Sequence, residues 1–174
     1  MSERIVFGYY RPSCRESIWV AEVDNELTVA GGCRCGAIRF EAAGAPVEVT
    51  YCHCSDCRGF SGAPVVTWVA FDSKNVHFTK GERKMFESSP GISWGFCKSC
   101  GTSISLDGVS ERYSGMHTTE FLVSTMDNPE KFVPDRHMYD SERLPWFDVA
   151  DNLPRYHKLD DGIEPTHFGP EKSE

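Results

Sequence analysis

Residues 31–36 read Gly-Gly-Cys-Arg-Cys-Gly, and residues 97–101 read Cys-Lys-Ser-Cys-Gly. Cysteine pairs flanked by glycine are typical of metal-binding knuckles, because glycine lets the backbone turn tightly and direct its N–H groups at sulfur. A structural zinc ion usually takes its four ligands as two such pairs from separate segments. The sequence therefore predicts a closed zinc site that joins the start of a sheet to its middle. The predicted ligands are Cys33, Cys35, Cys97 and Cys100.

A third cysteine motif lies between these two, where residues 51–58 read Tyr-Cys-His-Cys-Ser-Asp-Cys-Arg. Its cysteines, Cys52, Cys54 and Cys57, have no fourth cysteine nearby in the sequence. Three protein ligands and one free position are the usual arrangement of a catalytic zinc ion. His53 is the alternative fourth ligand, but we expect it to pack or hydrogen-bond beside the site, because a short loop cannot easily aim adjacent side chains at one ion. The motif predicts a second, open zinc site.

A disulfide framework is the alternative use of the eight cysteines. A chain of 174 residues is long for a disulfide-dependent scaffold, and its N-terminus lacks the pattern of a secretory signal. The tight spacing also suits convergence on one ion better than several bridges. Cys14 stands apart from the three motifs, and we expect it to be a small buried residue.

The composition limits the partners and the location. The formal net charge is −8, with 18 Lys and Arg against 26 Asp and Glu. This sign disfavours nucleic acid and anionic membranes, because both attract basic surfaces. The longest apolar run, residues 65–71, is far shorter than the roughly 20 residues that span a membrane. We expect a cytoplasmic protein, and no pattern indicates its oligomeric state.

Short runs with β character recur along the chain, separated by turn signals at residues 44–46, 72–75 and 88–91. Helical turns are expected only at 55–60 and 128–132. The pattern predicts a mainly β fold of short antiparallel strands. The domain covers residues 27–158, preceded by an N-terminal extension with strand character, 1–26, and followed by an acidic, mobile tail, 159–174. The expected strands are 37–41, 47–51, 65–71, 76–79, 84–87, 92–96, 103–106 and 121–124.

The three cysteine motifs, in this order, resemble the glutathione-dependent formaldehyde-activating family (GFA domain). Further matches are residues 126–129 (Met-Asp-Asn-Pro), the residues Pro134, His137, Ser141 and Trp146, and residues 152–154 (Asn-Leu-Pro). The resemblance covers about residues 27–158. It implies a β-tent fold like that of Mss4-type proteins, the same division of cysteines between a structural and a catalytic zinc, and carbon–sulfur lyase chemistry on glutathione and formaldehyde. The departures are the N-terminal extension and a longer link at residues 108–119, both of which can reshape a substrate pocket.

The open site predicts a mechanism. Three thiolates give the zinc centre a charge of −1, which weakens it as a Lewis acid, so we favour activation of a bound thiol over polarisation of a carbonyl. Arg58 is a candidate for a substrate carboxylate, with an exposed structural arginine as the alternative. Ser61 and Gly62 can line the pocket through backbone N–H groups, and His53 lies beside it.

Four further side chains have two interpretations each. Trp68 is expected in the core and Trp146 packed over the sheet. His137 and Asp127 are candidate acid–base groups, although both also fit structural hydrogen bonds.

The predicted function is that of a zinc-dependent carbon–sulfur lyase acting on an adduct of an aldehyde with a small-molecule thiol such as glutathione. One alternative is a non-catalytic zinc-binding module for protein interactions, which requires two closed four-ligand sites. The other is a redox or metal sensor whose exposed thiolates oxidise and release zinc.

Overall fold

The computed structural model describes residues 27–110, 115–159 and 164–168. The predicted N-terminal extension, residues 1–26 with Cys14, lies outside these residues. Within them the prediction of a mainly β fold with few helical turns is confirmed, because the strands form two sheets and only α1 (Ser55–Ser61) is an α-helix. Short 3-10 helices complete the described part: η1 (Ser73–Asn75), η3 (Val123–Thr125), η4 (Pro129–Lys131) and η5 (Asp140–Glu142).

The smaller sheet of the described chain has three antiparallel strands in the order β1 (Thr28–Gly32), β2 (Arg39–Ala43) and β5 (Val76–Lys80). Strand β1 was not among the predicted strands, because its two glycines belong to the cysteine knuckle. Gly31 is required there: a Cβ on this residue would lie 2.4 Å from the ring of Phe40 and 2.5 Å from the carbonyl of Thr125.

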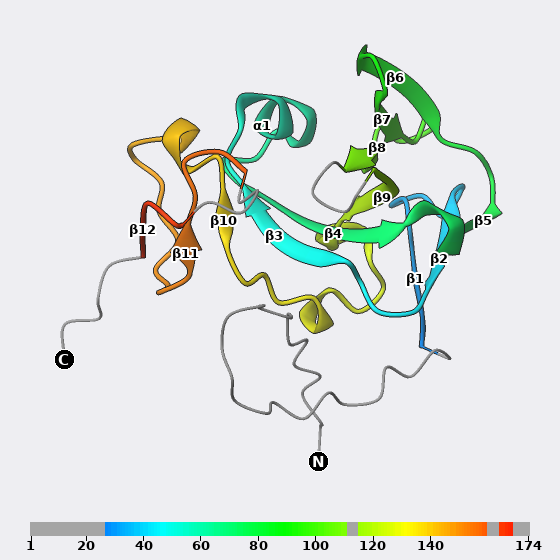
Figure 1. Ribbon diagram of the computed structural model, residues 1–174. Coiled ribbons are helices and arrows are strands. Elements are labelled where there is room, and N and C mark those ends of the chain that lie inside the picture. Colours follow the sequence, from blue (N-terminus) through cyan, green and yellow to red (C-terminus); the bar gives the residue numbers. More distant parts are fainter. Residues whose placement is uncertain (1–26, 111–114, 160–163, 169–174) are drawn as a thin grey trace.

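The larger sheet has nine strands among the described residues, in one continuous order. Neighbouring strands pair antiparallel, as predicted, except at β10 (His137–Met138). This strand runs parallel to both of its neighbours, β3 (Glu48–Cys52) and β11 (Pro154–Arg155). In Figure 1, β10 to β12 lie on one side of the molecule and β1, β2 and β5 on the other. The spatial order is β12 (His167–Phe168), β11 (Pro154–Arg155), β10 (His137–Met138), β3 (Glu48–Cys52), β4 (Val66–Asp72), β9 (Met116–Leu122), β8 (Ser103–Ser110), β7 (Ile92–Phe96) and β6 (Lys84–Ser89).

Strand β4 is covered on both faces, which explains its continuous apolar sequence. On one face, Val69 and Phe71 join a core to which the small sheet contributes Phe40, and the rings of Phe40 and Phe121 stack at 3.8 Å. On the other face, Trp68 joins a second cluster, against which Phe60 of α1 packs. This second cluster contains Cys52 and Cys57 and therefore positions the three-cysteine motif. Its buried members are Cys52, Cys57, Val66, Trp68, Trp94 and Leu122.

Three predicted segments differ from the structure. Residues 108–119, expected as a link, belong largely to the paired strands β8 and β9, so the longer segment extends a hairpin. The strand expected at 121–124 begins earlier, at Met116, and ends at Leu122, where η3 follows. Part of the segment expected as a mobile tail forms β12, which pairs antiparallel with β11. No helix of the described residues is long and apolar enough to cross a membrane.

Candidate metal centres

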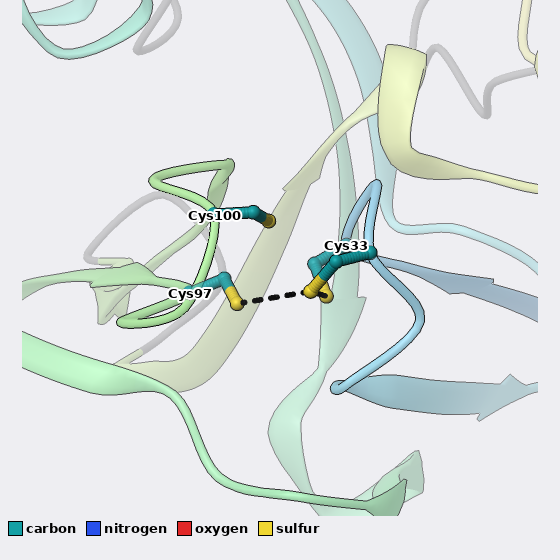
Figure 2. Close-up of side chains that lie close together, drawn as sticks. Cys33, Cys97 and Cys100 are labelled. Carbon is teal, nitrogen blue, oxygen red and sulfur yellow. Dashed lines mark hydrogen bonds between the residues drawn. The ribbon is translucent and has the colours of Figure 1, made fainter.

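The four-cysteine set comes from the turns of two hairpins. Cys33 and Cys35 lie between β1 and β2, and Cys97 and Cys100 lie between β7 and β8. The side chains of Cys97 and Cys100 point across to Cys33 (Figure 2). Their ligand atoms all lie within 4.8 Å of one another. The set therefore joins the small sheet to the large one, rather than two parts of one sheet.

The backbone of each turn is shaped around sulfur. The N–H of Ile38 donates to Sγ of Cys33 at 3.2 Å. Gly36 and Gly101 have φ values of 70° and 72°, a left-handed conformation that favours glycine, as the knuckle pattern predicts. The hydroxyl of Thr102 lies 3.1 Å from Sγ of Cys100 and lowers the pKa of this thiol to about 6. These N–H and O–H groups stabilise the thiolates that a metal requires.

The donor set fits zinc. A tetrahedral ion with four sulfurs at about 2.3 Å separates neighbouring sulfurs by about 3.8 Å. In the structure Sγ of Cys35 lies 3.5 Å from that of Cys33 and 3.9 Å from that of Cys97. Four sulfurs at these distances can hold one Zn²⁺ as a closed site.

The three-cysteine set is built where β3 meets α1. Cys52 ends the strand, Cys54 is the N-cap of the helix and Cys57 lies in its first turn. The N–H of Cys57 donates to Sγ of Cys54 at 3.3 Å. The three ligand atoms lie within 4.8 Å of one another, and no His, Cys, Asp or Glu of the described residues joins them as a fourth. All three donors are sulfur, so this set also fits zinc.

Contacts among the three thiols shift their pKa values in different directions. Contacts with the thiols of Cys52 and Cys57 lower the pKa of Cys54 to about 3. Contacts with Cys54 and Cys57, together with burial, raise the pKa of Cys52. Indole Nε1–H of Trp68, whose side chain is buried as predicted, donates to Sγ of Cys57 at 3.3 Å. Cys54 is half-buried whereas the other two are buried, so the set is reached from its side.

His53 does not join the three sulfurs as a ligand and instead begins a chain of hydrogen bonds. Its Nε2 lies 2.8 Å from Nδ1 of His137, whose Nε2 lies 3.0 Å from Asp151, and Asp151 accepts from Arg155 at 3.0 Å. A carboxylate can only accept, so Nε2 of His137 is the donor, its Nδ1 accepts from His53, and Nδ1 of His53 carries no proton. Burial, and the repulsion that a protonated His137 would exert, lower the pKa of His53 to about 4, in keeping with two neutral rings.

This chain holds the cysteine loop in place. His53, which was predicted to lie beside the substrate pocket, has no exposed surface. Its ring therefore supports the loop. His137 is also fully buried, which favours the structural interpretation of this residue. Asp127 forms an ion pair with Arg39 of β2, which favours the structural interpretation of this residue as well.

Two residues near the site were not predicted: Glu142 of η5 and Tyr139, the N-cap of η5. Glu142 accepts a hydrogen bond from the N–H of Ser55 at 2.7 Å, at the start of α1, where a negative charge is stabilising. Tyr139 packs against the cluster that contains Cys52 and has φ 56°, and no other described non-glycine residue has positive φ. Such strain is common at functional sites. Burial and the nearby cysteine charges raise the pKa of its phenol.

The predicted substrate contacts divide between two clefts. Arg58 and Gly62 line a cleft of about 380 Å³, but the N–H of Gly62 already donates to the carbonyl of Arg58 at 2.8 Å and is not free for a ligand. Ser61 lines a second cleft, of about 570 Å³, and its hydroxyl donates to the carbonyl of Cys57 at 2.8 Å. Trp146, expected over the sheet, is instead 73% exposed and lines the Arg58 cleft.

Comparison with known proteins identifies the family. A family model described as glutathione-dependent formaldehyde-activating enzyme matches residues 28–142, about two thirds of the chain. No curated protein matches. Among solved structures, a Rhodobacter sphaeroides protein is similar, with 20% identity and a TM-score of 0.44 over 56% of this chain and 87% of that chain. Because the model covers more than half of the sequence, the chain belongs to the glutathione-dependent formaldehyde-activating enzyme family.

Proposed function

We propose that the chain is a zinc-dependent enzyme of the carbon–sulfur lyase type. Its substrate is the adduct of a small thiol with an aldehyde, and glutathione with formaldehyde is the reference pair. The observation that carries the proposal is a donor set of three sulfurs without a fourth ligand atom among the residues that the structure describes. In the domain of residues 27–158, the proposed catalytic ligands are Cys52, Cys54 and Cys57, and the proposed structural ligands are Cys33, Cys35, Cys97 and Cys100.

The reaction is an addition or its reverse, without any change of oxidation state. In one direction the thiol sulfur adds to the aldehyde carbon, so that a C–S bond forms while the C=O π bond breaks, and the thiol proton ends on the new hydroxyl. In the reverse direction the C–S bond breaks and the proton returns to sulfur. Zinc held by the three cysteines would lower the pKa of the substrate thiol and provide its thiolate near neutral pH.

The residues around the sulfurs prepare the site for a thiolate. The indole N–H of Trp68 disperses the charge of Cys57, and the buried position of Cys52 excludes water from the inner side. The hydrogen-bonded pair of His53 and His137 fixes the loop between the ligands. A substrate sulfur therefore approaches from the half-buried side of Cys54.

Magnetisation-exchange NMR of glutathione and formaldehyde tests the proposal. Purified zinc-loaded protein should accelerate exchange between free glutathione and S-hydroxymethylglutathione, and a folded Cys54→Ser variant that retains one zinc should not. Two bound zinc ions with no acceleration for any small thiol and aldehyde would support the non-catalytic zinc module instead.

A further inference from the structure

The Arg58 cleft borders α1, the helix that has Cys54 as its N-cap and Cys57 in its first turn, and the N–H of Arg58 donates to the carbonyl of Cys54 at 3.1 Å. Arg58 follows Cys57 directly in α1, and the far wall of the cleft comes from the segment after η5, through Leu144 and Trp146. Apart from Arg58, the side chains that line it are apolar, and the indole of Trp146 is 73% exposed. The cleft thus has an apolar surface and one cationic group, next to a proposed catalytic ligand. Its lining residues are Arg58, Gly59, Gly62, Ala63, Pro64, Leu144 and Trp146.

Arg58 differs from most arginines of the described chain. Its Nε is buried without a hydrogen-bond partner, as are those of Arg136 and Arg143, but unlike them Arg58 has no ion-pair partner among the residues that the structure describes. A guanidinium presents several N–H donors in a planar fork that fits a carboxylate. A guanidinium without a carboxylate partner among the described residues, at the edge of an apolar cleft, is a place where an anionic ligand gains affinity. The arginines with carboxylate partners are Arg39, Arg83, Arg136, Arg143 and Arg155.

The second cleft offers a comparison. It is lined by polar side chains, among them Ser103 and Thr125, and by Arg34, which also has no ion-pair partner among the described residues. Arg34 is exposed and lies between Cys33 and Cys35 of the closed set, whereas Arg58 adjoins the open one. Of these two cations, Arg58 is therefore the one on the helix of the open site.

We propose that the Arg58 cleft binds the carboxylate of the thiol substrate, and that the substrate carries an apolar group that rests on Trp146. This inference depends on the proposed function, because the thiol of the same molecule reaches the three-cysteine set. The substrate class is a thiol carboxylate with an apolar or aromatic body, or its aldehyde adduct. The carboxylate gives specificity through Arg58, and the apolar body gives affinity through the indole.

Isothermal titration of the zinc-loaded chain with matched thiols tests the proposal. The probes are 2-benzyl-3-mercaptopropanoate, its primary amide, and 3-mercaptopropanoate, which lacks the benzyl group. We expect the benzyl carboxylate to bind about tenfold more tightly than its amide, as for one charge-assisted hydrogen bond. Arg58→Gln should abolish this preference, while Arg34→Gln, the matched loss of charge, should keep it. Trp146→Ala should weaken binding of the benzyl carboxylate and leave 3-mercaptopropanoate unchanged.

The outcomes separate this inference from the function on which it rests. Equal affinity for carboxylate and amide, or a preference that survives Arg58→Gln, overturns the carboxylate site and leaves thiol chemistry intact. Loss of the preference in Arg34→Gln alone would place the carboxylate in the second cleft and also overturn the proposal. If no thiol binds to protein that holds two zinc ions, the proposed function itself is wrong. Zinc content, measured for each variant, reports that the fold is kept.

Discussion

The indole of Trp68 should tune the affinity of the three-cysteine set for zinc. Its Nε1–H donates to Sγ of Cys57 at 3.3 Å, and the side chain is 2% exposed, so water cannot replace the bond in a Trp68→Phe variant. Trp94 provides a matched control. It belongs to the same cluster and is 7% exposed, but its indole donates to the hydroxyl of Ser88 at 2.7 Å. Trp94→Phe therefore makes the same change of side chain and removes one hydrogen bond, but not a hydrogen bond to a cysteine.

The structure sets the size of the effect. A hydrogen bond to a charged group contributes about 1.5–3 kcal/mol, and loss of a partner of a metal ligand typically lowers metal affinity by about 10–100-fold. Because sulfur is a weaker acceptor than oxygen, we expect the lower end, about tenfold weaker binding of one zinc ion in Trp68→Phe. The ion at Cys33, Cys35, Cys97 and Cys100 should be unaffected.

Competition against a chromophoric chelator measures this directly, because two zinc ions of different affinity are withdrawn in two phases. Trp68→Phe should shift only the weaker phase, and Trp94→Phe should shift neither. Equal shifts in both variants would mean that packing, not the hydrogen bond, sets the affinity. No shift in Trp68→Phe would contradict the role of the indole.

Three further predictions follow from single residues. The pKa of His53 is lowered from about 6.5 to about 4, so between these values the unfolded chain binds more protons than the folded one. The stability that His53 contributes is therefore complete above pH 6.5 and is lost as the pH falls toward 4. Denaturant unfolding across this range should show a shallower dependence of stability on pH in His53→Asn than in the parent chain. Gly101→Ala should lower the free energy of unfolding by about 1 kcal/mol because φ is 72°, whereas Gly59→Ala, within α1 and with open space around it, should raise or leave it, as measured by chemical denaturation. Cys97→Ser should prevent folding, because structural zinc contributes about 10–16 kcal/mol, and Cys54→Ser should fold with one zinc; circular dichroism and metal analysis distinguish the two, and a stable Cys97→Ser protein would refute the structural role.

The cysteine sets were predictable because metal-binding motifs are local. Spacing and glycine content alone divide the seven clustered cysteines into a set of four and a set of three, and the structure brings the sulfurs of each set within 4.8 Å. The turn conformation of Gly36 and Gly101 was predictable for the same reason. Strand β7 was predicted with its observed bounds, since its apolar run is bounded by a turn and a knuckle.

The surroundings of the open set could not be predicted, because they depend on contacts between distant segments. His53 and His137 meet only because β10 pairs parallel with β3, an arrangement that alternating strand patterns do not indicate. The left-handed backbone of Tyr139 had no signal, since such positions are expected at glycine. Trp146 was expected over the sheet as an apolar side chain, yet it borders a cleft, and burial of one residue cannot be read from its type alone.

Zinc K-edge X-ray absorption of the protein with and without a thiol substrate tests the central claim most directly. The account predicts two zinc ions per chain, with an average of about 3.5 sulfur ligands per ion and a light atom completing the open site. Addition of saturating glutathione should raise the average to about 4, as the substrate sulfur takes the fourth position at Cys52, Cys54 and Cys57. An average that does not change on addition of thiol, or a histidine bound in its absence and retained in its presence, would contradict an open site.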